Sequence, residues 1–484
     1  MTSPALRSAT ALLTALRTGE LTSRALLETY LDRIARLDGR LNAVVTLDAD
    51  TARQAADDAD TARARGAALG PLHGLPVTIK DSHETAALRT TSGFSGLADH
   101  VPTTDADAVA RLKAAGAIVF AKTNLPVLAG DAQSYNPLFG VTNNPWAVDR
   151  SPGGSSGGAA VAVAMGFTAF ELGSDIGGSI RTPCHWCGIY GHKPTHGIVS
   201  TRGHIPAMPG TLQSFDLEVS GPMARSAEDL ALVLDVLAGP TADRAVAWTL
   251  RLPPPRRTRL QDYRVAAWLD DPAFPVDDSV RTVLEATVVA LRRAGCRVDD
   301  ARPAVDFAGL TQTYFQLLMP ILMSNYPDDA FAGFIEMATA VPADDHSFFA
   351  TSVRFGTARH RDWLRANEAR AHLRMQLAEF FTRYDALLLP AASVPAIPHD
   401  HSEPLAAREI MVNGAATPYS HLFAWIALAT MAWNPATVAP VGRTATGLPV
   451  GVQIVGPYLE DYTTINVARQ LAPLIGGFEA PPGA

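Results

Sequence analysis

The chain has 484 residues, of which 47% are hydrophobic and 18% charged, a composition typical of a folded protein with a large core. Its formal net charge of −8 argues against nucleic-acid binding as its main function. Three cysteines are too few for a disulfide framework, so we expect a reducing compartment, the cytoplasm. The N-terminus shows neither a signal peptide nor a lipidation motif. The longest apolar run, residues 159–170, is too short to span a membrane and predicts a helix buried on all sides.

Helical and strand patterns alternate in the first part of the chain. Residues 20–40 carry apolar side chains at helical spacing, and residues 50–66 predict a second, exposed helix. Residues 77–79 predict a short strand that ends at Lys80, and a helix over 105–116 precedes a strand over 117–120. The order strand, helix, strand predicts parallel pairing and an α/β core.

The second part of the chain is more irregular. Residues 197–222 are punctuated by glycine and proline, with short strands at best, and 226–237 predict a helix. Residues 252–257 form the clearest linker candidate. A strand over 264–268, a helix over 278–295, a mostly helical stretch over 309–382, and strands at 386–389 and within 447–455 follow. Because the last strands return to the sheet, we expect a single domain over 1–484, in which 253–385 is a variable, mainly helical subregion. The large apolar side chains of this subregion line a pocket or simply pack between helices.

Two glycine-framed serine clusters, residues 153–158 and 175–179, are the main chemical signal. Glycine allows the backbone to approach a reacting group closely. Two turns that each carry a serine hydroxyl favour a site where one hydroxyl attacks and backbone N–H groups hold the resulting oxyanion. A pair of ordinary glycine-serine loops around a buried helix is the simpler alternative.

A serine nucleophile needs a base, and the sequence allows two kinds. The Gly-x-Ser-x-Gly pattern around Ser155 or Ser156 matches the nucleophile elbow of α/β-hydrolases, which use histidine, but Pro152 precedes it where a strand is required. Lys80 is the other candidate, provided that burial keeps it neutral. That requires its pKa to fall by roughly 3 units from about 10.4, at a cost on the order of 4 kcal/mol. A lone lysine at a strand end is otherwise a solvated surface group.

Several segments together resemble the amidase signature family. The matching segments are Gly74–Asp81, Ala121–Asn124, Ser151–Gly158, Gly173–Arg181, Lys193–Thr195 and residues 447–453, and their order and spacing fit the family over roughly residues 5–475. The resemblance implies an α/β fold with a large mixed, mostly parallel twisted sheet flanked by helices, and a helical subregion that caps the substrate pocket. It also implies hydrolysis of carboxylic amide bonds, with esters and carbamates as further substrates.

The resemblance also implies a role for individual residues. Ser179 stands where the family has its nucleophile, Ser155 where it has a bridging serine after a cis peptide bond, and Lys80 where it has the base. The oxyanion would be held by the N–H groups of Ser179 and of Ile176, Gly177 and Gly178. The loop that faces the substrate carries Ala129, Gly130 and Gln133. Asp175 and Arg181 would hold the nucleophile turn through hydrogen bonds.

Some positions depart from the family pattern. Ser174 stands where many relatives have threonine, and His192 where leucine is more common. Cys184 and Cys187 have C-x-x-C spacing, for which packing is a better explanation than zinc binding. The resemblance implies no metal, no cofactor, no nucleic acid and no membrane, and a small-molecule amide as the partner; a homodimer stays open. The alternative function is the amidase subunit of a tRNA-dependent amidotransferase, which shares the family and its triad but requires partner chains.

Overall fold

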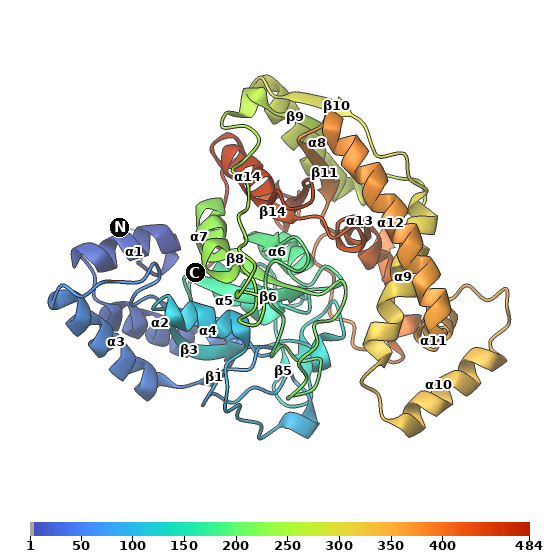
Figure 1. The fold of residues 1–484 in the computed structure, drawn as a ribbon. Coiled ribbons are helices and arrows are strands. Elements are labelled where there is room, and N and C mark those ends of the chain that lie inside the picture. Colours follow the sequence, from blue (N-terminus) through green and yellow to red (C-terminus); the bar gives the residue numbers. More distant parts are fainter. Residues whose placement is uncertain (1–3) are drawn as a thin grey trace.

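An 11-stranded mixed sheet runs through the computed structural model, which describes residues 4–484 (Figure 1). From one edge to the other, the strands are β1 (Val44–Leu47), β3 (Ile118–Thr123), β2 (Pro76–Lys80), β6 (Phe170–Asp175), β8 (Val219–Ala224), β7 (Tyr190–Lys193), β14 (Ala436–Arg443), β15 (Pro449–Val455), β11 (Ala386–Pro390), β9 (Arg264–Ala267) and β10 (Arg297–Asp300). Two further pairs lie outside it: β4 (Tyr135–Asn136) with β5 (Gly140–Val141), and β12 (Glu409–Val412) with β13 (Ala415–Pro418).

The predicted mixed sheet with flanking helices is confirmed, and so is the early strand–helix–strand unit. Strand β2, helix α4 (Asp107–Ala114) and β3 form that unit, and the two strands pair in parallel. Parallel pairing, which we expected through most of the sheet, occurs in the groups β3–β2–β6 and β11–β9–β10. The strands between these groups pair antiparallel. One reason is that β14 and β15 are joined by the short turn 444–448, and parallel neighbours would need a long crossover.

Three N-terminal helices lie together at one end of the molecule, coloured blue in Figure 1. They are α1 (Ala9–Thr18), α2 (Ser23–Leu37) and α3 (Ala49–Ala64), so the helices predicted over 20–40 and 50–66 are both present. Side-chain caps fix where α2 and α3 begin, since Thr22 accepts the N–H of Ala25 and Asp48 accepts that of Thr51.

The buried helix that we predicted over 159–170 is shorter than expected. Helix α5 (Gly157–Ala164) is buried at every position, but the chain then turns at Gly166 and enters β6 at Phe170. Gly166 has a φ of +64°, the left-handed region that favours glycine. The apolar run therefore covers a helix, a turn and the start of a strand, which hydropathy alone does not separate.

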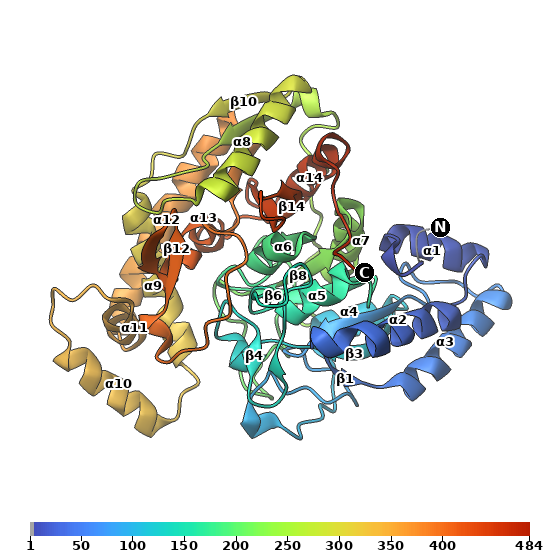
Figure 2. The same ribbon diagram turned by 180° about the vertical axis from the view of Figure 1, so that it is seen from behind.

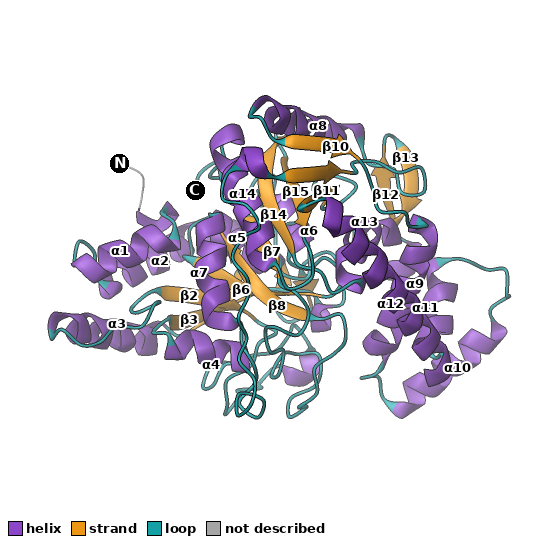
Figure 3. Ribbon diagram, turned by 45° about the horizontal axis from the view of Figure 1, so that its top comes forward, coloured by secondary structure: helices purple, strands orange, loops and turns teal. Residues whose placement is uncertain are grey.

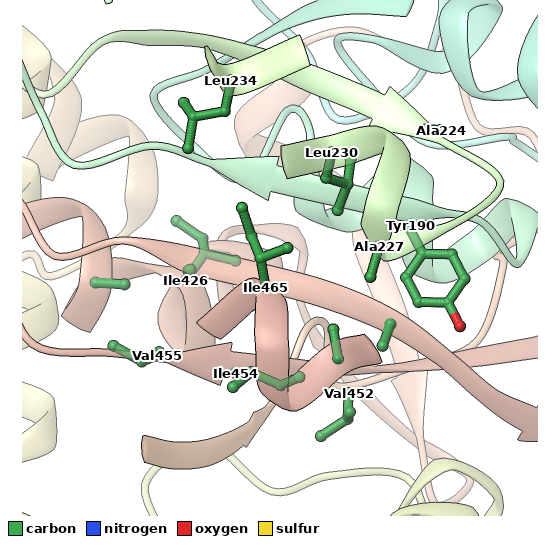
Figure 4. Packing of buried hydrophobic residues seen from close by; sticks show 14 of the residues in the cluster. Tyr190, Ala224, Ala227, Leu230, Leu234, Ile426, Val452, Ile454, Val455 and Ile465 are labelled. Carbon is green, nitrogen blue, oxygen red and sulfur yellow. The ribbon is translucent and has the colours of Figure 1, made fainter. Parts of the chain in front are cut away.

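Other helices cover the sheet (Figure 3). They are α6 (Arg181–Cys187), α7 (Ala227–Leu237), α8 (Asp278–Arg293) and α14 (Asp461–Ile475). Figure 4 shows Leu230 and Leu234 of α7 and Ile465 of α14 in one buried cluster with Val452 and Ile454 of β15. Short 3₁₀ segments occur at Pro4–Leu6, Asp38–Arg40, Ser95–Leu97, Val127–Ala129, Leu260–Asp262, Leu405–Ala407 and Tyr419–Phe423.

The second helical group lies at the opposite end of the molecule from α1–α3 (Figure 2). It consists of α9 (Phe307–Met323), α10 (Asp328–Ala340), α11 (Phe348–Gly356), α12 (His360–Arg383) and α13 (Ala424–Met431). The subregion 253–385 that we delimited begins with β9, α8 and β10 and is helical from Phe307 onward. No helix in residues 4–484 has both the length and the apolar character needed to cross a membrane.

Candidate active site

Lys80 lies at the end of β2, between β3 and β6, and its side chain is inaccessible to solvent. Every residue of β2 is buried, which places the Lys80 side chain and its amine inside the protein. Its Nζ lies 2.7 Å from Ser155 Oγ and 2.9 Å from Ser174 Oγ. Two residues that are 75 positions apart in the sequence are thus in direct hydrogen-bond contact.

The surroundings of Lys80 favour its neutral form. Burial lowers the pKa of Lys80 to about 7, although the negative charges of Glu218, Asp175 and Glu171 act in the opposite direction. Near pH 7, a large fraction of Lys80 therefore carries a free amine. A free amine can take a proton from a hydroxyl group at 2.7 Å, which an ammonium group cannot.

The first glycine-serine turn leads from residue 153 into α5. The peptide bond between Gly154 and Ser155 is cis, as the family resemblance implies. A Cβ atom on Gly154 would lie 2.6 Å from the backbone of the 131–133 loop, so only glycine fits there. Ser156 Oγ donates to the carbonyl oxygen of Ser174 at 3.3 Å, which ties this turn to β6.

The second turn, residues 176–180, follows β6 and carries Ser179. This serine is 7% exposed, and Gly178 beside it has a φ of +90°. The carbonyl oxygen of Ser179 accepts the N–H of Ser156 at 3.2 Å. The two turns are therefore in contact through their backbones, with Ser155 and Ser179 on adjoining loops.

A buried ion pair holds the Ser179 turn in shape. Arg181 donates through Nε and Nη2 to Asp175 at 3.0 and 2.7 Å, and both side chains are inaccessible to solvent. Burial alone would raise the pKa of Asp175, but Arg181 outweighs it and lowers the pKa to about 2. The Asp175 carboxylate also accepts the N–H groups of Gly178 and Ile180. The structural role that we expected for Asp175 and Arg181 is confirmed.

The backbone N–H groups of this turn divide into two kinds. The N–H of Gly178 donates to Asp175 at 3.0 Å, so Gly178, which we predicted as an oxyanion donor, is already engaged. Across residues 4–484, no hydrogen bond uses the N–H of Ile176, Gly177 or Ser179. Tyr314 of α9 donates its hydroxyl to the carbonyl oxygen of Ile176 at 3.0 Å. Because a trans peptide points its N–H away from its carbonyl, this bond directs the N–H of Gly177 away from Tyr314.

The loop predicted to face the substrate is only partly open. Gly130 is exposed and Ala129 is half-buried, whereas Gln133 is inaccessible to solvent. Both ends of the Gln133 amide are used: Nε2 donates to the carbonyl oxygen of Asp400 at 2.6 Å, and Oε1 accepts the N–H of Asp400 at 3.0 Å. Gln133 thus joins its loop to residue 400, and its contact with a substrate stays a prediction.

Two residues near Lys80, His204 and Glu218, were not predicted from the sequence. His204 Nε2 lies 2.9 Å from Ser174 Oγ, and His204 Nδ1 lies 2.5 Å from Glu218 Oε1. Both belong to the stretch 197–222, whose irregular pattern gave no strand or helix to place them on. With 13 histidines in the chain, no spacing singles out His204.

The C-x-x-C pair lies on α6, with both thiols buried. Burial raises the pKa of Cys184 and of Cys187. Cys187 Sγ lies 3.4 Å from the carbonyl oxygen of Pro152, and Cys184 packs against the backbone of Gly191. These contacts agree with a packing role.

Comparison with known proteins shows similarity to amidases and to an amidotransferase subunit. The family model described as "Amidase" matches residues 25–465. The chain is 35% identical to "Putative amidase AmiB2" of Mycobacterium tuberculosis, over 94% of this chain and 93% of that protein. It is 32% identical to a glutamyl-tRNA(Gln) amidotransferase subunit of Natronomonas pharaonis, over 83% of this chain and 96% of that protein. Among solved structures, one described as "Crystal structure of amidase" is 28% identical, with a TM-score of 0.78 over 97% of this chain and 100% of that one.

Proposed function

The chain belongs to the amidase signature family, and we propose that it cleaves carboxylic amide bonds through an acyl-enzyme formed on Ser179. Family membership makes it an amide-hydrolysing enzyme. The roles of Lys80 as base, Ser155 as bridging serine and Ser179 as nucleophile are the proposal. One observation carries it: the fully buried Lys80 Nζ lies 2.7 Å from Ser155 Oγ.

The first half of the reaction forms the acyl-enzyme. Neutral Lys80 takes a proton from Ser155 while Ser155 takes one from Ser179, and Ser179 Oγ attacks the carbonyl carbon of the substrate. A C–O bond forms, and the π electrons of the carbonyl move to its oxygen. The unengaged N–H groups of Ile176, Gly177 and Ser179 stabilise the resulting oxyanion.

The second half releases the products. The C–N bond breaks as Ser155 gives its proton to the leaving nitrogen and recovers one from Lys80, so the amine departs neutral. Water then gives a proton to the same relay and attacks the acyl ester. The C–O bond to Ser179 breaks, the carboxylic acid leaves and Ser179 regains its proton. The same steps cleave an ester or a carbamate.

The substrate and its surroundings are part of the proposal. We expect a small-molecule amide, with the helical part of 253–385 capping the pocket. The contact of Tyr314 on α9 with Ile176 supports this, since it brings that region to the nucleophile turn. We also propose the cytoplasm as the compartment, which the three unpaired, buried cysteines support.

Labelling with a fluorophosphonate tests the triad directly, because an activated serine oxygen attacks the phosphorus of the reagent and displaces fluoride. Mass spectrometry of the labelled protein should place the adduct on Ser179, and Lys80→Ala should label slower by a factor of roughly 10³. An adduct on Ser155 or Ser156, together with undiminished labelling of Lys80→Ala, would instead favour the nucleophile elbow of an α/β-hydrolase.

The amidotransferase subunit is the second candidate, supported by the 32% identity to such a subunit. The two functions differ in their need for partner chains. Hydrolysis of simple amides, esters or carbamates by the purified chain alone would support the first function. A chain that labels on Ser179 but hydrolyses no member of such a panel would support the second.

A further inference from the structure

We propose that His204 and Glu218 are positioning residues for Lys80: through the Ser174 hydroxyl they turn the free electron pair of its amine toward Ser155. The inference rests on the proposed roles of Lys80, Ser155 and Ser179. It adds two residues to the site, neither of which belongs to the triad that the family resemblance implies.

A continuous line of hydrogen-bonding groups leads from Glu218 to Ser155. Glu218 Oε1 lies 2.5 Å from His204 Nδ1, and His204 Nε2 lies 2.9 Å from Ser174 Oγ. Ser174 Oγ lies 2.9 Å from Lys80 Nζ, which in turn lies 2.7 Å from Ser155 Oγ. All five residues are buried, the most exposed being Glu218 at 7%. Water therefore has little access to replace any of these bonds.

The groups at one end determine which atom carries each proton. His204 Nδ1 faces two oxygens, the Glu218 carboxylate and the carbonyl oxygen of Pro206 at 3.1 Å. Both are acceptors, so Nδ1 must carry a hydrogen. We take His204 as the neutral imidazole, in which the other nitrogen is then bare, so that His204 Nε2 accepts the hydroxyl hydrogen of Ser174.

The direction of the hydrogen bond between His204 and Ser174 also sets the direction of the bond between Ser174 and Lys80. Ser174 has one hydroxyl hydrogen, and His204 receives it, so Ser174 Oγ can only accept from Lys80 Nζ. The neutral amine has two hydrogens and one free electron pair. One of these hydrogens is donated to Ser174. Lys80 can act as a base when its electron pair then faces Ser155 Oγ.

The charged groups around this line of hydrogen-bonding groups shift the pKa of Lys80. Glu218 raises the pKa of Lys80, as do Asp175 and Glu171, whereas burial lowers it more strongly. His83 is the other titratable neighbour of His204, with ring centroids 4.9 Å apart. Burial is the largest cause that lowers the pKa of His83 well below its usual value, so this neighbour is neutral near pH 7. Removal of the Glu218 charge should therefore make Lys80 easier to deprotonate.

The chain also contains a matched control for this arrangement. His192 forms a second buried histidine–carboxylate pair, with Nε2 3.0 Å from Asp461 Oδ1 and Nδ1 2.9 Å from Thr437 Oγ1. The remaining bonds of that carboxylate lead to Thr195. The pair has the same chemical groups as His204 and Glu218 but bonds to β14 and residue 195 instead of Lys80.

The main experiment measures kcat and KM against pH for the parent, Glu218→Gln and His192→Gln. In Glu218→Gln, we expect kcat to fall roughly 10- to 100-fold with KM unchanged, because the contact with His204 Nδ1 loses its negative charge. We also expect the acidic limb of kcat/KM to move to lower pH. His192→Gln should leave the position of that limb unchanged. An unmoved limb in Glu218→Gln, or a kcat within twofold of the parent, would overturn the inference.

A second pair of variants keeps the inference testable if Glu218→Gln does not fold. Ser174→Ala removes the bridging hydroxyl and should lower kcat roughly 10- to 100-fold. Ser174→Thr keeps the hydroxyl and should stay within threefold of the parent. Equal activity of the two variants would refute the inference. Fluorophosphonate labelling of the parent separates the two claims: no adduct on Ser179 overturns the proposed function, whereas an adduct on Ser179 with equal Ser174 variants overturns only the role of His204 and Glu218.

Discussion

Replacement of Lys80 by methionine should lower kcat/KM roughly 10³-fold and change how the free energy of unfolding depends on pH. Methionine has nearly the length of lysine and no charge, so Lys80→Met removes the titrating group with little change in volume. In the folded parent, Lys80 is inaccessible to solvent and its pKa is about 7. In an unfolded chain, the pKa of a lysine is about 10.4. The difference of roughly 3 units corresponds to about 4–5 kcal/mol.

The sign of the effect follows from proton binding. Below pH 7, Lys80 is protonated in both the folded and the unfolded parent. Burial of this charge then lowers the free energy of unfolding by the full amount of about 4–5 kcal/mol. Between pH 7 and about 10, the unfolded chain binds more protons, so the free energy of unfolding of the parent rises by about 1.4 kcal/mol per pH unit from this group. Lys80→Met lacks that rise. Its stability relative to the parent should fall by about 2.5 kcal/mol between pH 7.5 and 9.5.

Urea unfolding of parent and variant at several pH values measures this difference, and other titrating groups cancel in the comparison. Lys193→Met is the matched control. Lys193 is also inaccessible to solvent, with its pKa lowered to about 7 by burial, and its Nζ donates to the carbonyl oxygen of Pro194 at 2.8 Å. Both variants should show the same pH slope. Lys80→Met should lose roughly 10³-fold in kcat/KM, whereas Lys193→Met should keep kcat/KM within about tenfold of the parent.

A constant stability difference between parent and Lys80→Met from pH 7.5 to 9.5 would refute the reasoning. It would mean that Lys80 titrates alike in the folded and unfolded chain. Lys80 would then be charged near pH 7 and could not serve as the base.

Further variants test other parts of the site. Ser179→Ala should fold as the parent does and lose roughly 10³-fold or more in kcat/KM, and retained amide hydrolysis would exclude Ser179 as the nucleophile. Arg181→Met should lower the free energy of unfolding by about 3 kcal/mol in urea titrations, because it leaves the buried charge of Asp175 unpaired, and a loss under 1 kcal/mol would contradict the structural role given to Arg181. Gly154→Ala should yield little folded protein or unlabelled Ser179, since its Cβ would lie 2.6 Å from backbone atoms; normal fluorophosphonate labelling would show that this loop can shift. In the parent, kcat/KM should rise from acidic pH to a plateau with a midpoint near pH 7, as Lys80 loses its proton, and a flat profile between pH 6 and 8 would argue against it.

Much of the fold follows from local patterns. The helices α2, α3, α7 and α8 and the strands β2, β9 and β11 lie where periodicity and turn residues place them. The helix predicted over 159–170 was too long, because an unbroken apolar run contains no signal for where a buried helix ends and a buried strand begins. The antiparallel pairing of the central strands depends on which strands become neighbours, and a sequence read in order does not contain that information.

The residues available for catalysis can be recognised from the amino-acid sequence, because the glycine-framed serines and the lysine after an apolar strand lie in short local segments. Tertiary structure decided what those residues can do. Lys80 becomes a candidate base only because packing removes it from water and places it 2.7 Å from a serine 75 positions away. The same packing brings His204 and Glu218 into line behind Ser174. A pKa and a hydrogen-bond direction depend on everything that surrounds a group in space, and most of those neighbours are distant in the chain.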